Sequence, residues 1–531
     1  MAVIVRKPHI IGPPASLAPS AGPDTAHAAA SATDPSVVGW YPYAGSADAD
    51  LSDDLDKIIP RSRDLARNNG YVNGVRQTLA DNIIGSQLIL ASNPDSRLLG
   101  WDRAQAKEWA RLTESQFATW ANDAYECDAG RALPLLELAT MALSTWFLSG
   151  AAVVIPHWQP RPGARWNTRV QMIEPDRLET PPRYLTDLRV RRGVRLDNYG
   201  AAIGYYIRNT HPGDIDSMSA IPRYRYIPAF TDWGRRRIIH LFDRERPNQT
   251  HGKPLVTAVM REFRMATHYT RTELQATISN SLVAAFLKSN LSQDGAAELY
   301  GTTDIDTTNA TWKQAISQWQ PRLKGGAVIP LPPGAEIEAF QPNRPNQAFE
   351  AFMLSVLRNI AAGLNIPYEL LAKDFSKTNY SSARAAMLEA WRYFHSRRRW
   401  MENHLLTPLY ELWLEEAVNA GVIAAPGYYD NRFAYRRCTW TMSGRGWVDP
   451  QKEANAAGIR MQHNITTLRQ ECAEQGLDWE EVLEQRAEEL SLMRTLGIPT
   501  SAPASDQIIS GPSDQDAQPD QGEPDTMRDA A

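Results

Sequence analysis

The chain has 531 residues, of which 43% are hydrophobic, so it is long enough for several domains with a sizeable core. Its formal net charge of −5 argues against a protein that coats nucleic acid without sequence preference. The charge is uneven, because residues 501–531 hold seven acidic residues and one arginine and leave the rest of the chain near +1.

The N-terminal part begins with residues 1–40, whose content of Ala, Pro and Ser predicts a disordered arm. Apolar residues at helical spacing predict a helix from 53 to about 90, with Gly85 as a plausible stop, and a second helix from about 104 to 122. The apolar stretch 133–156 is nearly long enough to cross a bilayer. Because Ser149 and Gly150 interrupt it and β-branched residues follow, the sequence favours a buried helix, a turn and a strand.

Residues 151–242 have the composition of β-strands. Four short runs rich in β-branched and aromatic residues are separated by Pro, Gly and Asp. These runs read AAVVIPHW, RVQMIEP, AAIGYYIRN and RRIIHLF. Together with the helices before them, they predict an α/β domain of about 200 residues.

Long helices dominate the second half of the chain. A helix is predicted from Pro254 to about residue 285, because Pro254 suits a first helical turn and apolar residues recur on one face. Residues 286–344 are mixed and end in a strand-like stretch rich in Pro and Gly. Another helix is predicted from about 346 to Gly363, so two helices flank a small β insertion.

A loop, PYELLAKDFSKTNYSS, precedes a helix that is predicted from about 381 to 420 with a kink at Pro408. This helix contains WRYFHSRRRW, residues 391–400, where arginines stand beside aromatic residues. Arginine beside aromatic rings can indicate nucleic-acid binding. A DNA-binding helix, however, should gather its arginines on one exposed face.

Helical spacing favours packing over DNA binding for this stretch. At about 100° per residue an apolar stripe runs along the helix, and Arg398 falls inside it. Other arginines lie on both flanks, so they make no single basic groove. We expect them to pair with carboxylates on both sides, in a helix packed between its own and adjacent subunits. The residues predicted to take part are Trp391, Arg392, Arg397, Arg398, Arg399 and Trp400.

Motifs of enzymes and metal sites are missing from the sequence. No G-x-x-x-x-G-K-[ST] phosphate loop, H-E-x-x-H pair or G-x-S-x-G elbow occurs. The cysteines Cys127, Cys438 and Cys472 have no disulfide or zinc spacing and fit a reducing cytoplasm. Glutamates between 480 and 489 are read as a solvated helix face that could line a tunnel. We therefore predict no catalytic site, no metal site and no cofactor.

Four stretches of the sequence resemble the lambda-type portal proteins of tailed bacteriophages. The last two are the most specific, and the order and spacing of all four match that family. They are RDLARNNGYVNGVRQTLADNIIGSQL, GAAIGYYI, NIAAGLNIPYELLAKDFSKTNYSSARAAMLEAWRYFHSRRRW and TWTMSGRGWVDPQKEANAAGIRMQHNITTLRQECAEQGLDWEEVLEQRAEEL. The resemblance runs from about residue 50 to 495.

The resemblance implies an α+β portal fold, whose subunits have a wing, a two-helix stem, a clip, a loop facing the tunnel and a helical crown. The segments of this sequence fit that plan. They are an arm at 1–40, an α/β wing at 41–252, stem helices at 253–285 and 345–364, a small α/β clip at 286–344, a tunnel loop and long wing helix at 365–447, a crown at 448–495 and an acidic disordered tail at 496–531.

The resemblance also implies a structural function. About twelve copies would form a ring at one capsid vertex, through which DNA is packaged and ejected. The implied partners are the terminase large subunit, the major capsid and scaffold proteins, the head–tail connector proteins and double-stranded DNA, without a membrane. The implied location is the virion, and the host cytoplasm during assembly.

Contact with DNA, if it occurs, is expected in the tunnel loop. Two lysines there can meet phosphates, and neighbouring polar residues can bind the DNA backbone without reading sequence. The alternative is that the loop only caps the long helix, with Ser381 or Ser382 as the N-cap. The residues predicted to face DNA are Lys373, Lys377, Asn379, Tyr380 and Ser381.

Two other classes of function stay open from the residues. One is a nucleic-acid enzyme, such as a packaging ATPase or a nuclease, against which the missing phosphate loop counts. The other is a different structural protein of the virion, such as a tail or baseplate component. A ring with a central channel would separate a portal from both.

Overall fold

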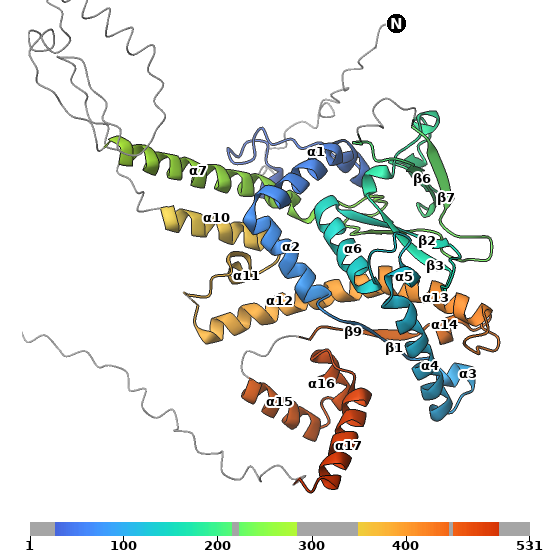
Figure 1. Ribbon diagram of the computed structural model, residues 1–531. Coiled ribbons are helices and arrows are strands. Elements are labelled where there is room, and N and C mark those ends of the chain that lie inside the picture. The colour runs from blue at the N-terminus through green and yellow to red at the C-terminus, as the bar shows by residue number, and fades with distance from the viewer. Residues whose placement is uncertain (1–26, 215–221, 284–348, 377, 445–449, 499–531) are drawn as a thin grey trace, which may run out of the picture.

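The computed structural model describes residues 27–214, 222–283, 349–376, 378–444 and 450–498. The predicted clip at 286–344 lies outside these ranges, as do most of the arm and most of the tail. The described part of the arm, residues 27–40, holds the short 3₁₀ helix η1 (Ala28–Ala30) and is largely exposed. The chain has an α+β fold in which three antiparallel sheets lie among helices (Figure 1).

The predicted first helix is two helices. α1 (Ala47–Asn68) ends at Asn69, which has extended backbone angles, and α2 (Gly70–Ile83) begins directly after it. The Asn69 side chain caps α2 by accepting a hydrogen bond of 3.1 Å from the Val72 amide. The helical periodicity continues across this break, which explains why it was not predicted.

Residues 88–90, predicted as the end of that helix, belong to a strand. Gly85 has a φ of 78° and ends the helical region as predicted, and β1 (Leu88–Ser92) follows. β1 pairs antiparallel with β9 (Cys438–Met442), which the sequence analysis missed altogether. A two-stranded sheet between segments so far apart in sequence leaves no local pattern to detect.

The short helices α3 (Ser96–Leu99) and α5 (Ala124–Cys127) flank α4 (Arg103–Ala121), which agrees with the helix predicted from 104 to 122. The apolar stretch 133–156 is a buried helix, a turn and a strand, as predicted: α6 (Leu135–Ser149), Gly150 and β2 (Ala151–Trp158). Gly150 has a φ of 80°, and a side chain there would meet the backbone of Gly252 and Lys253. No helix within the described residues is long and apolar enough to span a membrane.

The predicted strand region forms two sheets with a small core between them. β2 lies between β3 (Thr168–Ile173) and β8 (Ile239–Phe242). The second sheet has the order β4 (Val190–Arg191), β5 (Val194–Leu196), β6 (Ala202–Arg208), β7 (Tyr224–Pro228). The 3₁₀ turns η2 (Pro175–Arg177) and η3 (Pro182–Tyr184) connect the two. The named strands pair antiparallel throughout, so this region is α+β, and the term α/β was too specific.

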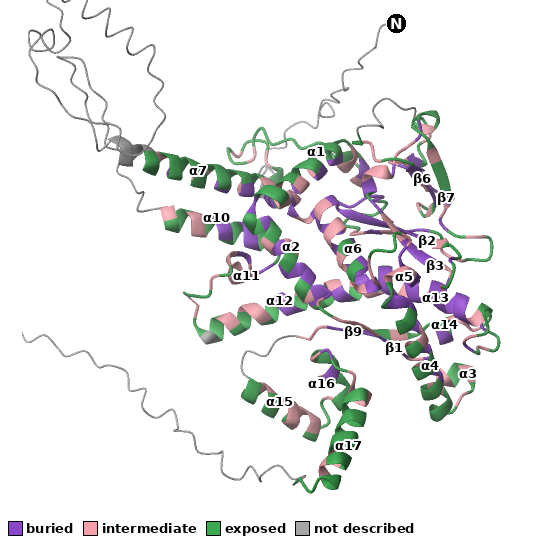
Figure 2. Ribbon diagram, in the orientation of Figure 1, coloured by how far each residue is buried: buried purple, intermediate pink, exposed green. Residues whose placement is uncertain are grey.

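The two helices predicted on either side of the insertion project from the body together (Figure 1). A 3₁₀ turn, η5 (Leu255–Val259), leads into α7 (Met260–Val283), and α10 (Phe349–Gly363) packs beside it. Val259, Phe263 and Ile360 are buried where the pair joins the body. Farther out α7 is largely exposed (Figure 2).

The predicted long helix crosses the body as one helical path. It consists of α12 (Tyr380–Met401), a π-helical turn, η6 (Glu402–Leu406), and α13 (Thr407–Asn419). Pro408 has no N–H to donate to the preceding turn, and the path widens into the π turn just before it. The irregularity expected at Pro408 is therefore a π turn.

The predicted apolar stripe on this path is buried. Phe394, Met401, Leu405 and Leu409 are each at most 2% exposed and belong to the main core. α13 also buries Tyr410 and Trp413 against Phe117 of α4. From Ala390 onward the path thus runs through the core, whereas residues 381–389 of α12 include none that is buried.

The C-terminal helices form a separate layer next to α4 (Figure 1). After α14 (Arg432–Tyr435) and β9 come α15 (Pro450–Gln462), α16 (Leu468–Glu474) and α17 (Trp479–Thr495). Their helical nature agrees with the predicted crown. α15 and α17 contain no buried residue, so polar contacts with the body carry much of the attachment.

Candidate functional site

Arg397, in the middle of the arginine-rich stretch, lies among aromatic rings and one carboxylate. Its Nη1 is 2.7 Å from Oδ2 of Asp243, directly after β8. The guanidinium lies 5.4 Å from the ring centres of both Trp146 and Tyr393, and Trp400 is 6.0 Å away. This is the carboxylate pairing that the sequence predicted for the flanks of the helix, combined with cation–π contacts.

Arg398 is buried, at 8% exposed, and its partners are backbone carbonyl groups rather than a carboxylate. Its guanidinium donates two hydrogen bonds to the carbonyl oxygen of Asn82, at 2.8 and 3.2 Å, and one to the carbonyl oxygen of Ser443. It also lies 5.3 Å from the centre of the Trp391 ring. Burial lowers the pKa of this arginine. Arg398 therefore joins the end of α2 to the segment after β9 through the backbone.

Arg392 and Arg399 are exposed, and within the described residues neither forms an ion pair. With Arg397 on one flank and Arg398 buried, the arginines point to different sides of α12, as the spacing predicted. Trp391 is buried and Trp400 half-buried, the latter 5.2 Å from Trp146 between ring centres. The stretch packs within its own subunit, and its part in contacts between subunits stays a prediction.

The loop before α12 is a helix connection with one clear cap. α11 (Tyr368–Ala372) ends at Lys373, which is exposed and has a φ of 54°. The N-cap of α12 is Asn379, whose Oδ1 accepts a hydrogen bond of 2.8 Å from the Ser382 amide. The prediction that Ser381 or Ser382 is the N-cap was therefore wrong, and Ser381 is exposed in the first turn. Lys377 and the side chain of Tyr380 lie outside the described residues.

Two buried glutamates fix the far end of the helical path, and no pattern in the sequence predicted them. Glu416 accepts hydrogen bonds from the amides of Asn167 and Thr168, at 2.6 and 2.8 Å. Glu415 pairs with Arg235 at 2.7 Å and with Arg432 at 3.4 Å. Both glutamates are at most 3% exposed. Glu416 thus attaches α13 to the start of β3, and Glu415 attaches it to Arg235 and to α14.

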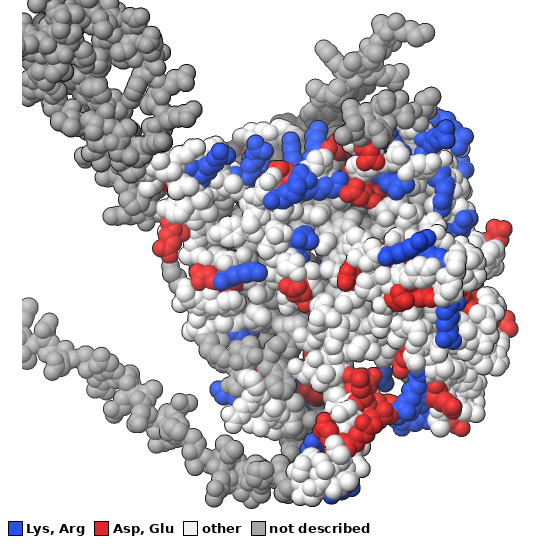
Figure 3. Space-filling view, in the orientation of Figure 1, with Lys and Arg blue, Asp and Glu red and all other residues white. Residues whose placement is uncertain are grey.

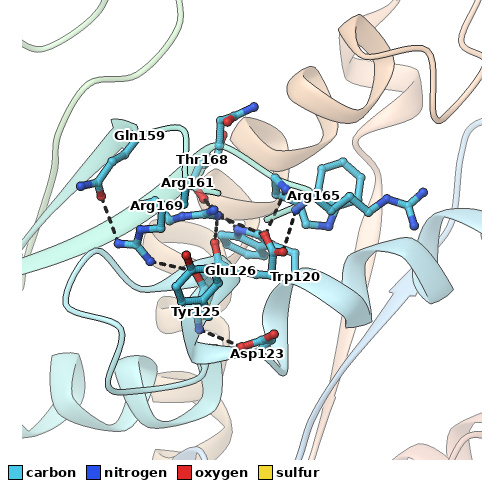
Figure 4. Close-up of polar contacts among 12 residues, drawn as sticks. Trp120, Asp123, Tyr125, Glu126, Gln159, Arg161, Arg165, Thr168 and Arg169 are labelled. Carbon is cyan, nitrogen blue, oxygen red and sulfur yellow. Dashed lines mark hydrogen bonds and ion pairs between the residues drawn. The ribbon is translucent and has the colours of Figure 1, made fainter. Parts of the chain in front are cut away.

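Another buried carboxylate, that of Glu126, also lies near the start of β3. Figure 4 shows the Glu126 carboxylate receiving the backbone amides around Arg165 and facing the Arg169 side chain. The closest ion-pair atoms of Glu126 and Arg169 are 3.4 Å apart, and Arg169 is completely buried. Backbone partners satisfy the carboxylate, so this cluster is structural rather than catalytic in kind.

One group of potential metal ligands occurs in the described residues, which the sequence did not reveal. Glu174, Asp176 and His211 place their ligand atoms within 4.8 Å of one another. Arg63 already occupies this group, with its guanidinium bonded to Asp176 and to Ser149. These residues therefore form an ion network in which Arg63 is the cation.

The C-terminal helices meet the rest of the body around a cavity of about 980 Å³ that borders α4, β9, α16 and α17. Glu480 lies 2.8 Å from Lys107 and 3.3 Å from Arg111, and Glu484 also pairs with Arg111. Part of the glutamate run thus contacts α4, whereas the rest is exposed as predicted.

Glu114 on α4 lies at this cavity and has a perturbed pKa. Burial raises its pKa to about 7, and the nearby charges of Asp478 and Glu480 act in the same direction. Its Oε1 accepts a hydrogen bond of 2.6 Å from the Ser92 amide, which opposes the shift. Deprotonation of Glu114 therefore adds a negative charge close to Asp478 and Glu480 of the C-terminal helices.

Residues 33–398 match the family model described as phage portal protein, lambda family. The chain is 28% identical over 490 residues to portal protein B of Escherichia phage lambda, covering 89% of this chain and 90% of that protein. It is 28% identical over 491 residues to the portal protein of Escherichia phage N15, with coverage of 89% and 91%. A probable portal protein of Halomonas phage phiHAP-1 is 26% identical over 463 residues, with coverage of 86% and 84%.

Solved structures of gene transfer agent particles are also similar. One is the neck of a native particle computed with C12 symmetry, at 13% identity and a TM-score of 0.37. Another is the neck of an empty particle computed with C6 symmetry, at 13% identity and a TM-score of 0.39. In each comparison the aligned region covers 80% of this chain and 93% of the chain from the particle.

Replacing Arg398 with Ala should destabilise the chain by about 1–3 kcal/mol, because two buried carbonyl groups lose their donors. Chemical denaturation of parent and variant at equal protein concentration measures this difference. Arg399→Ala, on the exposed side of the same helix, is the matched control and should change stability by less than about 0.5 kcal/mol. Equal losses in both variants would contradict the role of Arg398.

Glu114→Gln should make stability less dependent on pH. The folded-state pKa of about 7 lies above the ordinary value of 4.5, so between these pH values the native chain binds more protons than the unfolded chain. The contribution of Glu114 therefore falls as pH rises through this window. The carboxylate is partly exposed to solvent, which reduces the size of the effect. Between pH 5 and pH 8 we therefore expect the free energy of unfolding of Glu114→Gln to rise by about 1–2 kcal/mol relative to that of the parent. Parallel pH profiles of the two proteins would rule this out.

Proposed function

The chain belongs to the lambda family of phage portal proteins, and we propose that about twelve copies form a ring around a channel for duplex DNA. In this proposal the protein is a structural component of the virion and has no enzymatic activity. It forms the portal at one capsid vertex, through which the genome enters during packaging and leaves during ejection.

The observation that carries the ring is the exposed apolar surface on the two projecting helices. Leu274 and Ile278 on α7 are 60% and 50% exposed, and Phe352 on α10 is 51% exposed. Large apolar side chains on a projecting helix pair are costly to leave in water, and burial stabilises by about 25 cal/mol per Å². Adjacent copies in a closed ring would cover this surface on every subunit.

The competing functions have less support. The sequence has no phosphate-binding loop for an ATPase. The buried or half-buried carboxylates described above have hydrogen-bond or ion-pair partners in the body, which favours a structural role over a nuclease. A tail or baseplate protein would not account for the match to the portal family over residues 33–398.

We assign partners to the parts of the subunit as follows. The clip at 286–344 would meet the terminase large subunit during packaging and the head–tail connector proteins afterwards. The wing at 41–252 would face the major capsid and scaffold proteins. Assembly would take place in the host cytoplasm.

The tunnel loop is the place where we propose contact with DNA. Lys373 is exposed at the end of α11, between helices that run in different directions (Figure 1). Asn379 has its Oδ1 engaged in capping α12, which leaves its amide NH₂ for a phosphate. Such contacts would position DNA without reading its sequence.

Replacing Leu274 with Glu should prevent ring formation while the subunit stays folded. Placing a carboxylate in a dry contact would weaken each interface by about 2 kcal/mol or more. Native mass spectrometry of parent and variant measures the oligomer, and circular dichroism reports folding. The control is Leu188→Glu, since Leu188 is 88% exposed in the wing and lies away from α7 and α10. A Leu274→Glu variant that still forms rings like the parent would refute the proposed interface.

The double variant Lys373→Ala, Lys377→Ala should keep ring stability but reduce genome packaging or retention. Each lost phosphate contact should lower the slope of log affinity against log salt by about 0.9. DNA content of assembled particles, measured across salt concentrations, tests this. Arg223→Ala with Arg225→Ala is the matched control, because these exposed cations lie at the start of β7 and not in the tunnel loop. If the lysine variant packages and retains DNA normally at every salt concentration, the loop is only a helix connection.

A further inference from the structure

A row of cations follows one face of α7. Arg261, Arg264, His268 and Arg271 are spaced three, four and three residues apart, which places them on one side of a helix. All four side chains are exposed, and within the described residues none of the three arginines forms an ion pair. Figure 3 shows basic side chains gathered along this edge of the molecule, over α7 and α1. α7 thus has the one-sided arrangement that α12 lacks.

The row borders a groove of about 1120 Å³ between α1 and α7. Arg61 of α1 faces it from the opposite wall, and the partly buried side chains of Ile58, Leu65 and Met260 provide apolar surface. Asp64 is the one acidic residue among the described residues that line the groove, and it accepts a hydrogen bond of 2.7 Å from Asn68. The groove therefore combines cationic walls with an apolar floor.

This combination fits an acidic peptide better than a nucleic-acid backbone. Phosphates would use the arginines but would leave the apolar floor in contact with sugar and water. A peptide with carboxylates on either side of aliphatic residues would use both the walls and the floor.

The chain contains such a peptide among the segments that the structure does not describe. Residues 499–531 hold seven acidic residues and one arginine, and Ile508 and Ile509 stand between Asp506 and Asp514. The other long segments do not match, since residues 1–26 have two basic and one acidic residue and residues 284–348 have five basic and six acidic. We propose that the acidic segment 499–531 docks in the groove between α1 and α7, in its own subunit or in a neighbouring copy.

The segment is long enough for this. It starts after α17, at the opposite end of the molecule from α7 (Figure 1). Its 33 residues span up to about 110 Å when extended, whereas the 40 helical residues from Tyr380 to Asn419 span only about 60 Å. Docking would connect the crown with the stem and mask the basic face of α7.

A labelled peptide of residues 499–531 tests the docking in trans. The acceptor is the full-length chain in which Asp506, Asp514, Asp516, Asp520 and Asp525 are replaced by Asn, so that its own segment cannot compete. Fluorescence anisotropy should show binding that weakens several-fold from low to physiological salt, because exposed ion pairs are screened. No binding at low salt would overturn the proposal.

Charge reversal on α7 identifies the site. Arg261→Glu, Arg264→Glu and Arg271→Glu together should weaken peptide binding at least about tenfold, as expected for several lost ion pairs. The matched control reverses the exposed Arg223 and Arg225 at the start of β7 and should leave binding unchanged, and thermal unfolding checks that both acceptors are folded. Equal affinity in the α7 variant would overturn the proposal.

Two further probes examine the floor and the ligand class. A peptide with Ile508→Ser and Ile509→Ser should bind at least about threefold more weakly, since it loses apolar burial. Duplex DNA should fail to displace the unmodified peptide at equal concentration. Unchanged binding by the Ser peptide, or full displacement by DNA, would make the groove a general polyanion surface and would contradict docking of this segment.

Discussion

The helical path from Tyr380 to Asn419 is the constraint on which the rest of the body depends. Near its middle, Arg398 holds the carbonyl groups of Asn82 and Ser443 together. Near its end, Glu416 holds the backbone of Thr168. Buried charges are stable only where other groups satisfy them, and here the backbone does so. The path therefore determines where α2, β3 and β9 lie relative to one another, and with them the two-stranded sheet that lies beside the crown.

The same contacts explain how an arginine-rich helix can belong to a DNA conduit without holding DNA. Arg397 and Arg398 are used for packing against aromatic rings, a carboxylate and carbonyl groups. Each phosphate contact in a channel would add a salt-dependent attraction that opposes movement of the genome. These two cations stabilise the packing of α12 within its own subunit, so they are not available to bind DNA. The exposed cationic face is on α7, where we assign it a peptide instead.

The elements that could be predicted are those that neighbouring residues in the sequence mark. The helix, turn and strand around Gly150 could be predicted because a left-handed glycine and a change from helical to β-branched residues mark them. The apolar stripe of α12 and α13 was confirmed for the same reason. The pairing of β1 with β9 could not be predicted, because it joins residues about 350 positions apart. The partner of Arg398 was missed since backbone carbonyls, unlike carboxylates, leave no mark in a sequence.

The central claim is that the chain forms a closed ring whose neighbouring copies cover the exposed apolar side chains of α7 and α10. An electron-microscopy reconstruction of particles assembled from the full-length chain tests it most directly. We expect a ring with a central channel, in which the next subunit buries Leu274, Ile278 and Phe352. A particle without a channel, or a ring in which these side chains stay in solvent, would contradict it.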